Sequence, residues 1–336
     1  MSKRVVVTGA SGNVGTSVVR ELAADPAVGS IVGLARRRPA WSSDKLSWHP
    51  VDLADEDAGA ALDPILTGAD AVIHLAWMIQ PARDPWTTWQ TNVLGSVRVF
   101  ESVARTGVPS LVYASSVGAY SPGPKDRRVT EDWPTHGWPT ASYTREKAYV
   151  ERVLDGFERA NPRTRVVRMR PAFLFKRAAA SEQRRLFAGP LVPGGLLRHL
   201  PIVPSVPGLR LQALHTDDAA RAYCLAVHGD IRGAVNLAVE PVLDAALLAD
   251  VLGARVLPLP TQALRTPLAA AWHLHLTPAS PDLFDAALRM PLLDSTRART
   301  ELGWQPRYDA RTAVTELVEG MRDGAGMPTP PLTPDG

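Results

Sequence analysis

The segment Val5–Gly15, VVVTGASGNVG, carries an apolar run directly into three glycines spaced three residues apart. Residues 4–8 have the continuous apolar and β-branched character of a strand that is buried on both faces of a parallel sheet. Residues 13–24 place their apolar side chains on one helical face. The start of the chain is therefore constrained to a strand, a tight glycine turn and a helix.

A turn of this kind lets backbone N–H groups approach a ligand at the helix N-terminus, where the peptide dipoles favour a pyrophosphate. Gly9 would make the turn, Gly12 would let the phosphates come close, and Gly15 would let the helix pack against the strand. The dinucleotide contacts expected in this stretch are Gly9, Ser11, Gly12, Asn13, Val14 and Gly15.

Further apolar runs alternate with helical patterns along the first two thirds of the chain. Strands are expected at residues 31–35, 71–76, 110–115 and 165–170, and helices at 89–105, 142–158 and 216–228. This alternation predicts an α/β fold, a doubly wound parallel sheet of the Rossmann type. Ligands of such sheets bind beyond the carboxyl ends of the strands.

The character of the sequence changes after Pro171, and residues 189–208 are rich in proline and glycine, as in a substrate lid or a domain crossover. The prediction is a dinucleotide-binding domain over 1–172, completed by about 211–239. A smaller substrate lobe would comprise 173–210 and 240–323. Residues 324–336 read as a flexible tail with too little apolar content to order itself.

Composition narrows the classes of partner. The 336 residues include 37 Lys+Arg and 34 Asp+Glu, and no dense basic run is interleaved with aromatic residues, so nucleic acid is not an expected partner. The single cysteine, Cys224, excludes an internal disulfide and suits helix packing. His273 and His275 are the nearest approach to a metal-ligand pair, and no metal is expected.

No apolar stretch of about 18 residues is free of charges and prolines, and the chain passes at once into a core strand. The expectation is a soluble cytoplasmic protein that does not engage a membrane.

Tyr143 and Lys147 lie four residues apart in an expected helix and therefore share a face. An adjacent ammonium would lower the pKa of the phenol from about 10 toward neutrality, as a proton donor to a carbonyl requires. Ser116 ends an expected strand on the same sheet edge as the glycine turn, with its neighbour Ser115 as the competing candidate. Each residue also has an ordinary reading, as a surface pair or a strand terminus.

The ordered set Thr8-Gly9-x-x-Gly12-x-x-Gly15, Ser116 and Tyr143-x-x-x-Lys147 resembles the extended short-chain dehydrogenase/reductases, the NAD-dependent epimerase/dehydratase-like family. The likeness covers most of the chain. Further matching segments are Asp52-Leu53, His74-Leu75-Ala76, Asn92, Arg170-Pro171, His215-Thr216-Asp217-Asp218 and Leu302-Gly303-Trp304-Gln305-Pro306.

The resemblance implies hydride transfer at a nicotinamide, with Tyr143 as acid or base and Ser116 holding the substrate oxygen. Lys147 would bind ribose hydroxyls and bias Tyr143 toward ionisation, and Asn92 would support the proton relay. Asp52 and Leu53 would contact adenine, and Leu75, Ala76 and Pro171 would lie along the cofactor. A homodimer is expected because the helices at 89–105 and 142–158 resemble those through which relatives pair.

The choice of cofactor depends on the end of the second strand. A site for NAD normally has an acidic residue there, whereas this chain has Ala35 followed by Arg36, Arg37 and Arg38. A guanidinium suits a 2′-phosphate, so NADP is favoured over NAD, with Arg36 as the contact.

Three functional readings remain open. Aromatic residues near the expected pocket, with Trp77, Trp138 and Phe173 as substrate contacts, predict an oxidoreductase for a hydrophobic ketone or alcohol. The alternative is a nucleotide-sugar epimerase with bound NAD. The diphosphate of its nucleotide-sugar substrate could bind among the arginines at 177, 184, 185, 198 and 210. The pair Val117-Gly118 disfavours a dehydratase, and a non-catalytic dinucleotide sensor would not need the Tyr143, Lys147 and Ser116 set.

Overall fold

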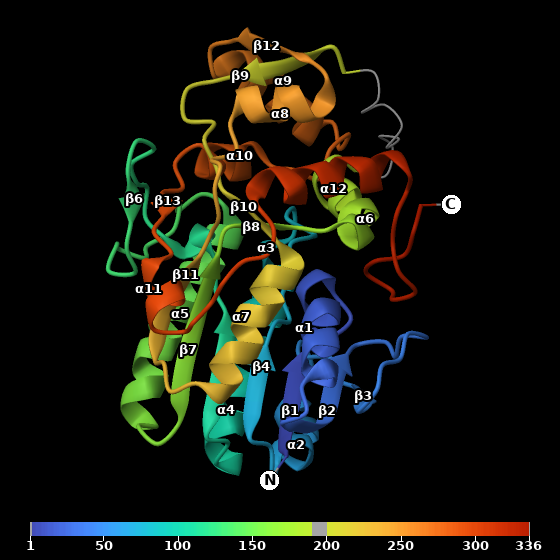
Figure 1. The fold of residues 1–336 in the computed structure, drawn as a ribbon, viewed down its shortest axis with the longest axis vertical. Coiled ribbons are helices and arrows are strands. Elements are labelled where there is room, and N and C mark those ends of the chain that lie inside the picture. The colour runs from blue at the N-terminus through green and yellow to red at the C-terminus, as the bar shows by residue number, and fades with distance from the viewer. Residues whose placement is uncertain (1, 190–199, 336) are drawn as a thin grey trace.

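A seven-stranded, all-parallel sheet forms the centre of the computed structural model, which describes residues 2–189 and 200–335 (Figure 1). The strands run in the order β11-β7-β5-β4-β1-β2-β3. Their bounds are β1 (Lys3–Thr8), β2 (Val28–Ala35), β3 (Leu46–Pro50), β4 (Ala71–His74), β5 (Ser110–Ala114), β7 (Arg165–Pro171) and β11 (Gly233–Leu237). The predicted doubly wound α/β fold is confirmed.

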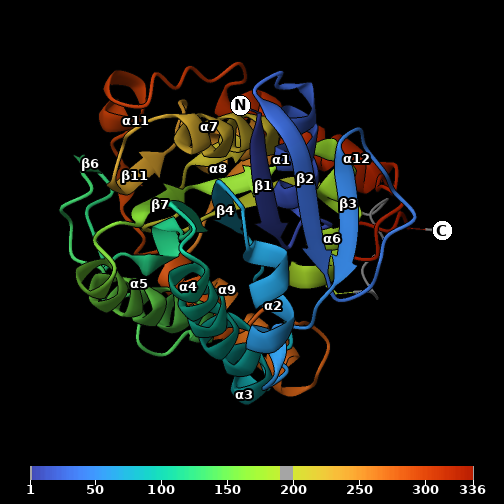
Figure 2. The same ribbon diagram turned by 90° about the horizontal axis from the view of Figure 1, so that it is seen from below.

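Helices cover both faces of the sheet (Figure 2). One face is covered by α1 (Asn13–Ala24) and α7 (Thr216–His228), and the other by α2 (Ala58–Leu66), α4 (Gly95–Thr106) and α5 (Ser142–Ala160). Val5 and Val7 pack in the core on the α1 and α7 side, whereas Val6 packs with α2 and α4. This explains the unbroken valine run, because β1 is buried on both faces.

The helix expected over 89–105 is divided into three parts. Asp84 caps α3 (Pro85–Trp89) by accepting from the backbone N–H groups of Trp86 and Thr87, and a π-helical turn, η1 (Gln90–Leu94), leads into α4. The side chain of Asn92 within this turn bonds the backbone of Met78, the segment that leaves β4. A tertiary contact therefore interrupts a regular sequence period.

Strand β3 and helix α2 were not predicted from the sequence. Strand β3 lies at the sheet edge and is largely exposed, so it has no continuous apolar run. Helix α2 contains Pro64 and spans nine residues. Both are short, and neither carries a strong periodic signal.

The remaining elements lie mainly above the carboxyl ends of the sheet strands (Figure 1). Short strand pairs are formed by β8 (Phe173–Phe175) with β10 (Ala213–His215), β9 (Ile202–Ser205) with β12 (Arg255–Pro258), and β6 (Arg128–Val129) with β13 (Leu292–Leu293). The helices of this layer are α6 (Ala180–Phe187), α8 (Ala245–Leu252), α9 (Gln262–His273), α10 (Pro281–Ala287) and α12 (Ala310–Arg322), while α11 (Thr296–Thr300) packs beside β11. Of the proline-rich stretch 189–208, residues 190–199 lie outside the described residues.

The C-terminal segment packs against the body, in contrast to the expected flexible tail. Met327 and Leu332 are buried with Ala179 and against Trp41, and Asp335 pairs with Arg184 and Arg185. Two apolar anchors and one carboxylate are enough to order a segment whose average composition is polar. None of the helices in the described ranges has the length and hydropathy of a membrane span.

Candidate active site

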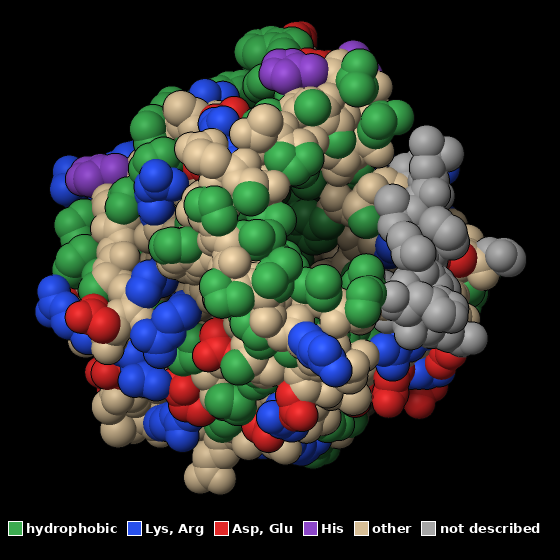
Figure 3. Space-filling model, turned by 90° about the horizontal axis from the view of Figure 1, so that it is seen from above, with side chains coloured by type: hydrophobic (Ala, Val, Ile, Leu, Met, Phe, Trp, Pro, Cys, Tyr) green, Lys and Arg blue, Asp and Glu red, His purple; other side chains and the backbone are tan. Residues whose placement is uncertain are grey.

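A large cavity lies at the carboxyl ends of the central strands, with a volume of about 750 Å³. Its walls come from the turn between β1 and α1, the segments after β2, β4, β5 and β7, and helices α5, α6, α9 and α10. From above, the molecular surface is hollowed, and hydrophobic side chains surround the opening (Figure 3). The cavity occupies the position at which the sheet order reverses, between β1 and β4, as expected for an open α/β sheet.

The glycine turn is closely packed at two of its three glycines. Gly9 has a φ of +67°, and a Cβ on it would lie 2.7 Å from the backbone nitrogen of Ala76. A Cβ on Gly15 would lie 2.2 Å from the carbonyl oxygen of Gly9. A Cβ on Gly12 would meet only that same oxygen, at 3.5 Å, on the side where Gly12 lines the cavity. The turn is therefore an open cradle at a helix N-terminus, which fits a pyrophosphate.

Asn13 contributes to this site through its backbone. Its side-chain amide donates to the carbonyl of Leu174 at 3.2 Å and accepts from the hydroxyl of Thr216 at 3.1 Å. The side chain thus joins α1 to β8 and α7 and is not free for a ligand. Ser11 and Val14 line the cavity beside it.

A buried cation lies against the first turn of α1, and the sequence analysis missed it. The ammonium of Lys176 donates to the carbonyl of Asn13 at 2.6 Å and to the hydroxyls of Thr16 at 2.8 Å and Ser17 at 2.9 Å. Burial lowers the pKa of Lys176 to about 8, with Asp217 opposing the shift. No local motif marks this lysine, because its partners are about 160 residues away in the chain.

The ends of β2 and β3 supply the other expected cofactor contacts. Ala35, Arg36, Asp52 and Leu53 all line the cavity. The guanidinium of Arg36 is exposed and has no hydrogen-bond or ion-pair partner among residues 2–189 and 200–335. One oxygen of Asp52 accepts from the backbone N–H of Ala54 at 3.0 Å.

The catalytic candidates meet at the base of the cavity. The phenol of Tyr143 donates to the hydroxyl oxygen of Ser116 at 3.0 Å, and that oxygen also accepts from the backbone N–H of Gly118 at 3.0 Å. The ammonium of Lys147 donates to the carbonyl of Ala114 at 2.7 Å. The structure therefore brings Tyr143, Ser116 and Lys147 together at the ends of β5 and the start of α5.

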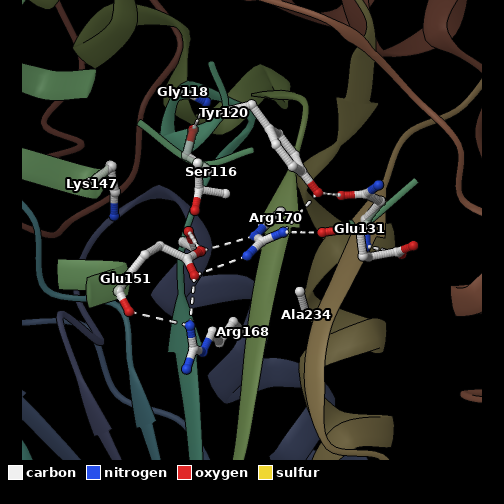
Figure 4. A network of polar contacts seen from close by, with 12 residues as sticks. Ser116, Gly118, Tyr120, Glu131, Lys147, Glu151, Arg168, Arg170 and Ala234 are labelled. Carbon is white, nitrogen blue, oxygen red and sulfur yellow. Dashed lines mark hydrogen bonds and ion pairs between the residues drawn. The ribbon is translucent and has the colours of Figure 1, made fainter. Parts of the chain in front are cut away.

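Ser115 has a different role from Ser116. Its hydroxyl donates to Glu151 at 2.6 Å, away from Tyr143. Glu151 is buried and also accepts from Arg168 at 3.0 Å and from Arg170 at 2.9 and 3.0 Å (Figure 4). These hydrogen bonds and ion pairs overcome the burial penalty and lower the pKa of Glu151 to about 2.

Arg170 extends this network toward the catalytic turn. It donates to the phenol of Tyr120 and to the carbonyl of Glu131, each at 2.9 Å (Figure 4). Tyr120 in turn donates to Asn236 on β11 at 2.6 Å. Strands β5, β7 and β11 and helix α5 are thus joined beneath Ser116. Glu151 was not anticipated, although its spacing of four residues from Lys147 places it on the same helical face.

The protonation of Tyr143 differs from the expectation. Burial raises the pKa of Tyr143, and the hydrogen bond with Ser116 opposes this shift only in part. Burial likewise lowers the pKa of Lys147 well below its usual value. In the enclosed pocket the cost of burying a charge exceeds the effect of the neighbouring group.

Asn92 occupies a supporting position outside the cavity lining. Its amide nitrogen donates to the carbonyl of Met78 at 2.8 Å and to Glu146 at 2.7 Å, and its oxygen accepts from the N–H of Met78 at 2.7 Å. It bonds neither Tyr143 nor Lys147 within the described part of the chain. Its observed contacts fix the segment after β4.

That segment also carries Leu75 and Ala76, which line the cavity. Their N–H groups both donate to the hydroxyl of Thr8 at 3.2 Å, and this hydroxyl lies 2.7 Å from Nδ1 of His74. The end of β4 is thereby held against the glycine turn. Pro171, at the end of β7, lines the cavity as well.

Three of the four expected substrate contacts, Trp77, Ser116 and Phe173, line the cavity. Trp138 does not: it packs against an apolar cluster that Phe173 also contacts, with the guanidinium of Arg289 4.5 Å from its ring centroid. Apolar residues from α6, α9 and α10 complete this part of the wall, and sequence reasoning missed them. They are Leu186, Phe187, Leu268, Leu283, Phe284 and Ala287.

Over the described ranges, no three His, Cys, Asp or Glu side chains are arranged to hold an ion. Cys224 is buried in α7, and burial raises the pKa of its thiol.

Comparison with known proteins agrees with this fold. The model of the NAD dependent epimerase/dehydratase family matches residues 5–238. An uncharacterized protein of Mycobacterium tuberculosis is 27% identical over 327 residues, which cover 96% of this chain and 31% of that protein. UDP-glucose 4-epimerase 2 of Arabidopsis thaliana is 28% identical over 186 residues, 51% of each chain.

Solved structures share the fold at lower identity. The crystal structure of the UDP-glucose 4-epimerase of Thermus thermophilus, in complex with NAD, superposes with a TM-score of 0.70 and 21% identity, over 95% of this chain and 99% of that one. The match shows the fold, and its bound NAD belongs to that protein.

The chain belongs to the NAD dependent epimerase/dehydratase family, a group of NAD(P)-dependent enzymes within the extended short-chain dehydrogenase/reductases. It spans about a third of the length of the first curated relatives that it matches, and about half of the curated epimerases.

Proposed function

We propose that this protein is an NADP-dependent oxidoreductase that transfers a hydride between the nicotinamide and a carbonyl or secondary alcohol of a hydrophobic small molecule. The observation that carries the proposal is the Tyr143–Ser116 hydrogen bond of 3.0 Å at the base of a cavity whose outer wall is apolar. Such a site can exchange a proton with an oxygen atom and bind an apolar substituent beside it.

The residues present fit a dinucleotide. The turn at Gly9–Gly15 would hold the pyrophosphate, with Lys176 adding a positive charge beneath it. Asp52 and Leu53 would contact the adenine. The guanidinium of Arg36, unpaired within the described part of the chain, and the alanine in place of an acidic residue at position 35 support a 2′-phosphate and hence NADP. When bound, the cofactor supplies or accepts the hydride.

The protein side chains handle the substrate oxygen and its proton. The hydroxyls of Ser116 and Tyr143 would bind that oxygen, and Tyr143 would donate a proton to it during reduction or remove one during oxidation. Groups already in place then stabilise the charge that develops on the oxygen. Lys147, in the ammonium form, would favour the ionised phenol.

The substrate end of the cavity supports an apolar ligand. Among the described lining residues, positive charge comes only from Arg36, Lys147 and Arg185. Arg185 donates to the carbonyls of Pro331 and Thr333 and pairs with Asp335. We infer that segments 173–210 and 240–323 form the lobe that recognises this ligand.

Most of the arginines that could bind the diphosphate of a nucleotide sugar already have partners within the protein. Arg177 pairs with Asp323, and Arg184 pairs with Asp335. Arg210 donates to the carbonyl of Lys125 at 2.7 Å. Arg198 lies outside the described residues.

The second candidate is a nucleotide-sugar epimerase with bound NAD. The family match and the similarity to proteins described as UDP-glucose 4-epimerases favour it. It would use the same Tyr143 and Ser116.

We also infer that two copies associate through α5 and the adjacent α3. Trp86 is 61% exposed and Tyr149 is 47% exposed, and the ring of Tyr149 packs on Trp89 with centroids 4.8 Å apart. Exposed aromatic side chains of this kind are typical of an interface.

The decisive experiment is a turnover assay with two arms. In one arm the protein and NADPH are supplied with a panel of cyclic, aryl and long-chain ketones; in the other, UDP-glucose or UDP-galactose is added without external cofactor. Oxidation of NADPH by a ketone is the expected result. Interconversion of the sugars without net cofactor consumption would replace the proposal by the epimerase, and tight NADPH binding with no turnover would favour the sensor.

A further inference from the structure

Trp77 makes an unusual contact with the catalytic lysine. It follows β4 by three residues and lines the cavity. The ammonium nitrogen of Lys147 lies 3.4 Å from the centroid of its ring, well inside the range of a cation–π interaction. The same ring meets Tyr143 edge to face, with centroids 6.2 Å apart. One side chain therefore contacts both members of the Tyr143–Lys147 pair.

Lys147 has few other groups to compensate its charge. It is 3% exposed, and its one hydrogen bond among the described residues goes to the carbonyl of Ala114. Glu146 and Glu151, on the same helix, attract the ammonium without bonding it. Their carboxylates are bonded elsewhere: Glu146 accepts from Thr88 and Asn92. Glu151 accepts from Ser115 and pairs with Arg168 and Arg170.

The sheet side of Lys147 offers two more titratable groups. The ring of Tyr113, on β5, lies 5.2 Å from the ammonium. His74, on β4, is buried and kept neutral, since burial lowers its pKa to about 3 and Lys147 adds to the shift. Neither group carries a charge that could balance an ammonium. Besides the carbonyl of Ala114, the ring face of Trp77 is the closest electron-rich group that contacts the ammonium in the described ranges.

We propose that Trp77 is a positioning residue that favours the ammonium form of Lys147 against the cost of burial and so shifts the pH range in which Tyr143 can exchange its proton. The physical reason is that a cation–π interaction gains strength when water is excluded, and it stabilises only the charged state of the lysine. This inference rests on the proposed role of Tyr143 as the acid or base. It assigns to Trp77 a function through Lys147, in place of direct substrate contact.

Two substitutions of Trp77 distinguish the effect of its aromatic ring from the effect of its volume. Trp77→Phe retains an aromatic face, whereas Trp77→Leu retains apolar volume without one. Trp272→Leu is the matched control: it removes an indole of α9 outside the cavity lining, with the guanidinium of Arg83 3.6 Å from its ring centroid. All three are tested as full-length proteins, with folding checked by thermal unfolding.

The first readout is the pH profile of kcat/KM for alcohol oxidation with NADP. In Trp77→Leu the limb of the profile that reports the ionisation of Tyr143 should move to higher pH by about one unit, because a neutral Lys147 no longer favours the phenolate. The value of kcat/KM at neutral pH should then fall about tenfold. Trp77→Phe should retain the wild-type limb. A higher KM with an unmoved limb in Trp77→Leu would overturn the proposal and identify Trp77 as a substrate contact.

The second readout does not depend on turnover. The ultraviolet absorbance of tyrosinate is titrated in each protein and in the same protein with Tyr143→Phe, so that the difference isolates Tyr143. The pKa of Tyr143 should be higher in Trp77→Leu than in wild type and Trp77→Phe. Equal values in all three would overturn the proposal, and this holds even if no substrate of the enzyme is found.

Discussion

The phenol of Tyr143 donates a hydrogen bond to the hydroxyl of Ser116 across 3.0 Å, and the two side chains come from segments 27 residues apart. If this pair exchanges the substrate proton, Tyr143→Phe should lower kcat by about a thousandfold, within the range for loss of a general acid or base. The affinity for NADPH should stay within about threefold, because the cradle at Gly9–Gly15 is untouched. Stopped-flow turnover and equilibrium titration of the variant check both numbers. Turnover at the wild-type rate would remove Tyr143 from the mechanism.

Ser115 should matter for a different reason. Ser115→Ala removes the bond that joins the Ser115–Ser116 turn to Glu151 on the catalytic helix. We expect kcat to fall about tenfold through loss of alignment, with NADPH affinity unchanged.

The control for Ser115→Ala is Ser102→Ala, which removes another serine–carboxylate bond, a partly buried one with Asp63 outside the cavity lining. Both variants should lose about 1 kcal/mol of unfolding free energy. Equal effects on kcat in both would show that the Ser115 bond contributes only stability.

His74 predicts a specific loss of stability in acid. It lies 2.7 Å from Thr8 and 2.9 Å from Ser96, and burial lowers its pKa to about 3. The unfolded chain, with a pKa of about 6.5, takes up the proton first, so stability is full above about pH 6.5. It then falls by about 1.4 kcal/mol per pH unit toward pH 3.

Urea unfolding between pH 7.5 and 4.5 measures this slope. His74→Asn should be less stable at neutral pH but should lose less stability on acidification. The same slope in both proteins would show that other groups dominate.

Glu182 predicts a pH dependence of cofactor binding. It lines the cavity on α6, where burial raises its pKa to about 7 against Lys176 and Arg185. Above that pH a carboxylate near the pyrophosphate cradle would repel the ligand. The test uses NADH, because the 2′-phosphate of NADPH itself changes charge in this pH range. NADH should bind about threefold more tightly at pH 6 than at pH 8. Glu182→Gln should reduce the difference and leave the part that comes from Lys176, whose pKa is about 8. An undiminished difference in that variant would show that Glu182 does not contribute.

Short-range sequence patterns explain which helices and site residues could be predicted. The bounds of α1 and α7 follow from apolar periodicity, and Tyr143, Lys147 and Ser116 follow from spacing along one helix and at one strand end. Parallel strands with short connections then bring these segments to one sheet edge.

Long-range pairs account for what could not. Lys176 reaches Asn13 from 163 residues away, and Arg184 orders the C-terminal segment through Asp335. Trp138 is expected at the pocket as one of several aromatic residues near its mouth, but the sequence does not show which apolar cluster a tryptophan joins. Such contacts exist only after the chain has folded.

The central claim, an NADP-dependent enzyme, is tested most directly by titrating the purified protein with NADPH and NADH side by side, after release and identification of any nucleotide retained from expression. The account predicts at least tenfold tighter binding of NADPH, and loss of that preference in Arg36→Ala, because the guanidinium at the end of β2 would pair with the 2′-phosphate. Tightly retained NAD, or equal affinity for both cofactors in wild type and Arg36→Ala, would contradict it.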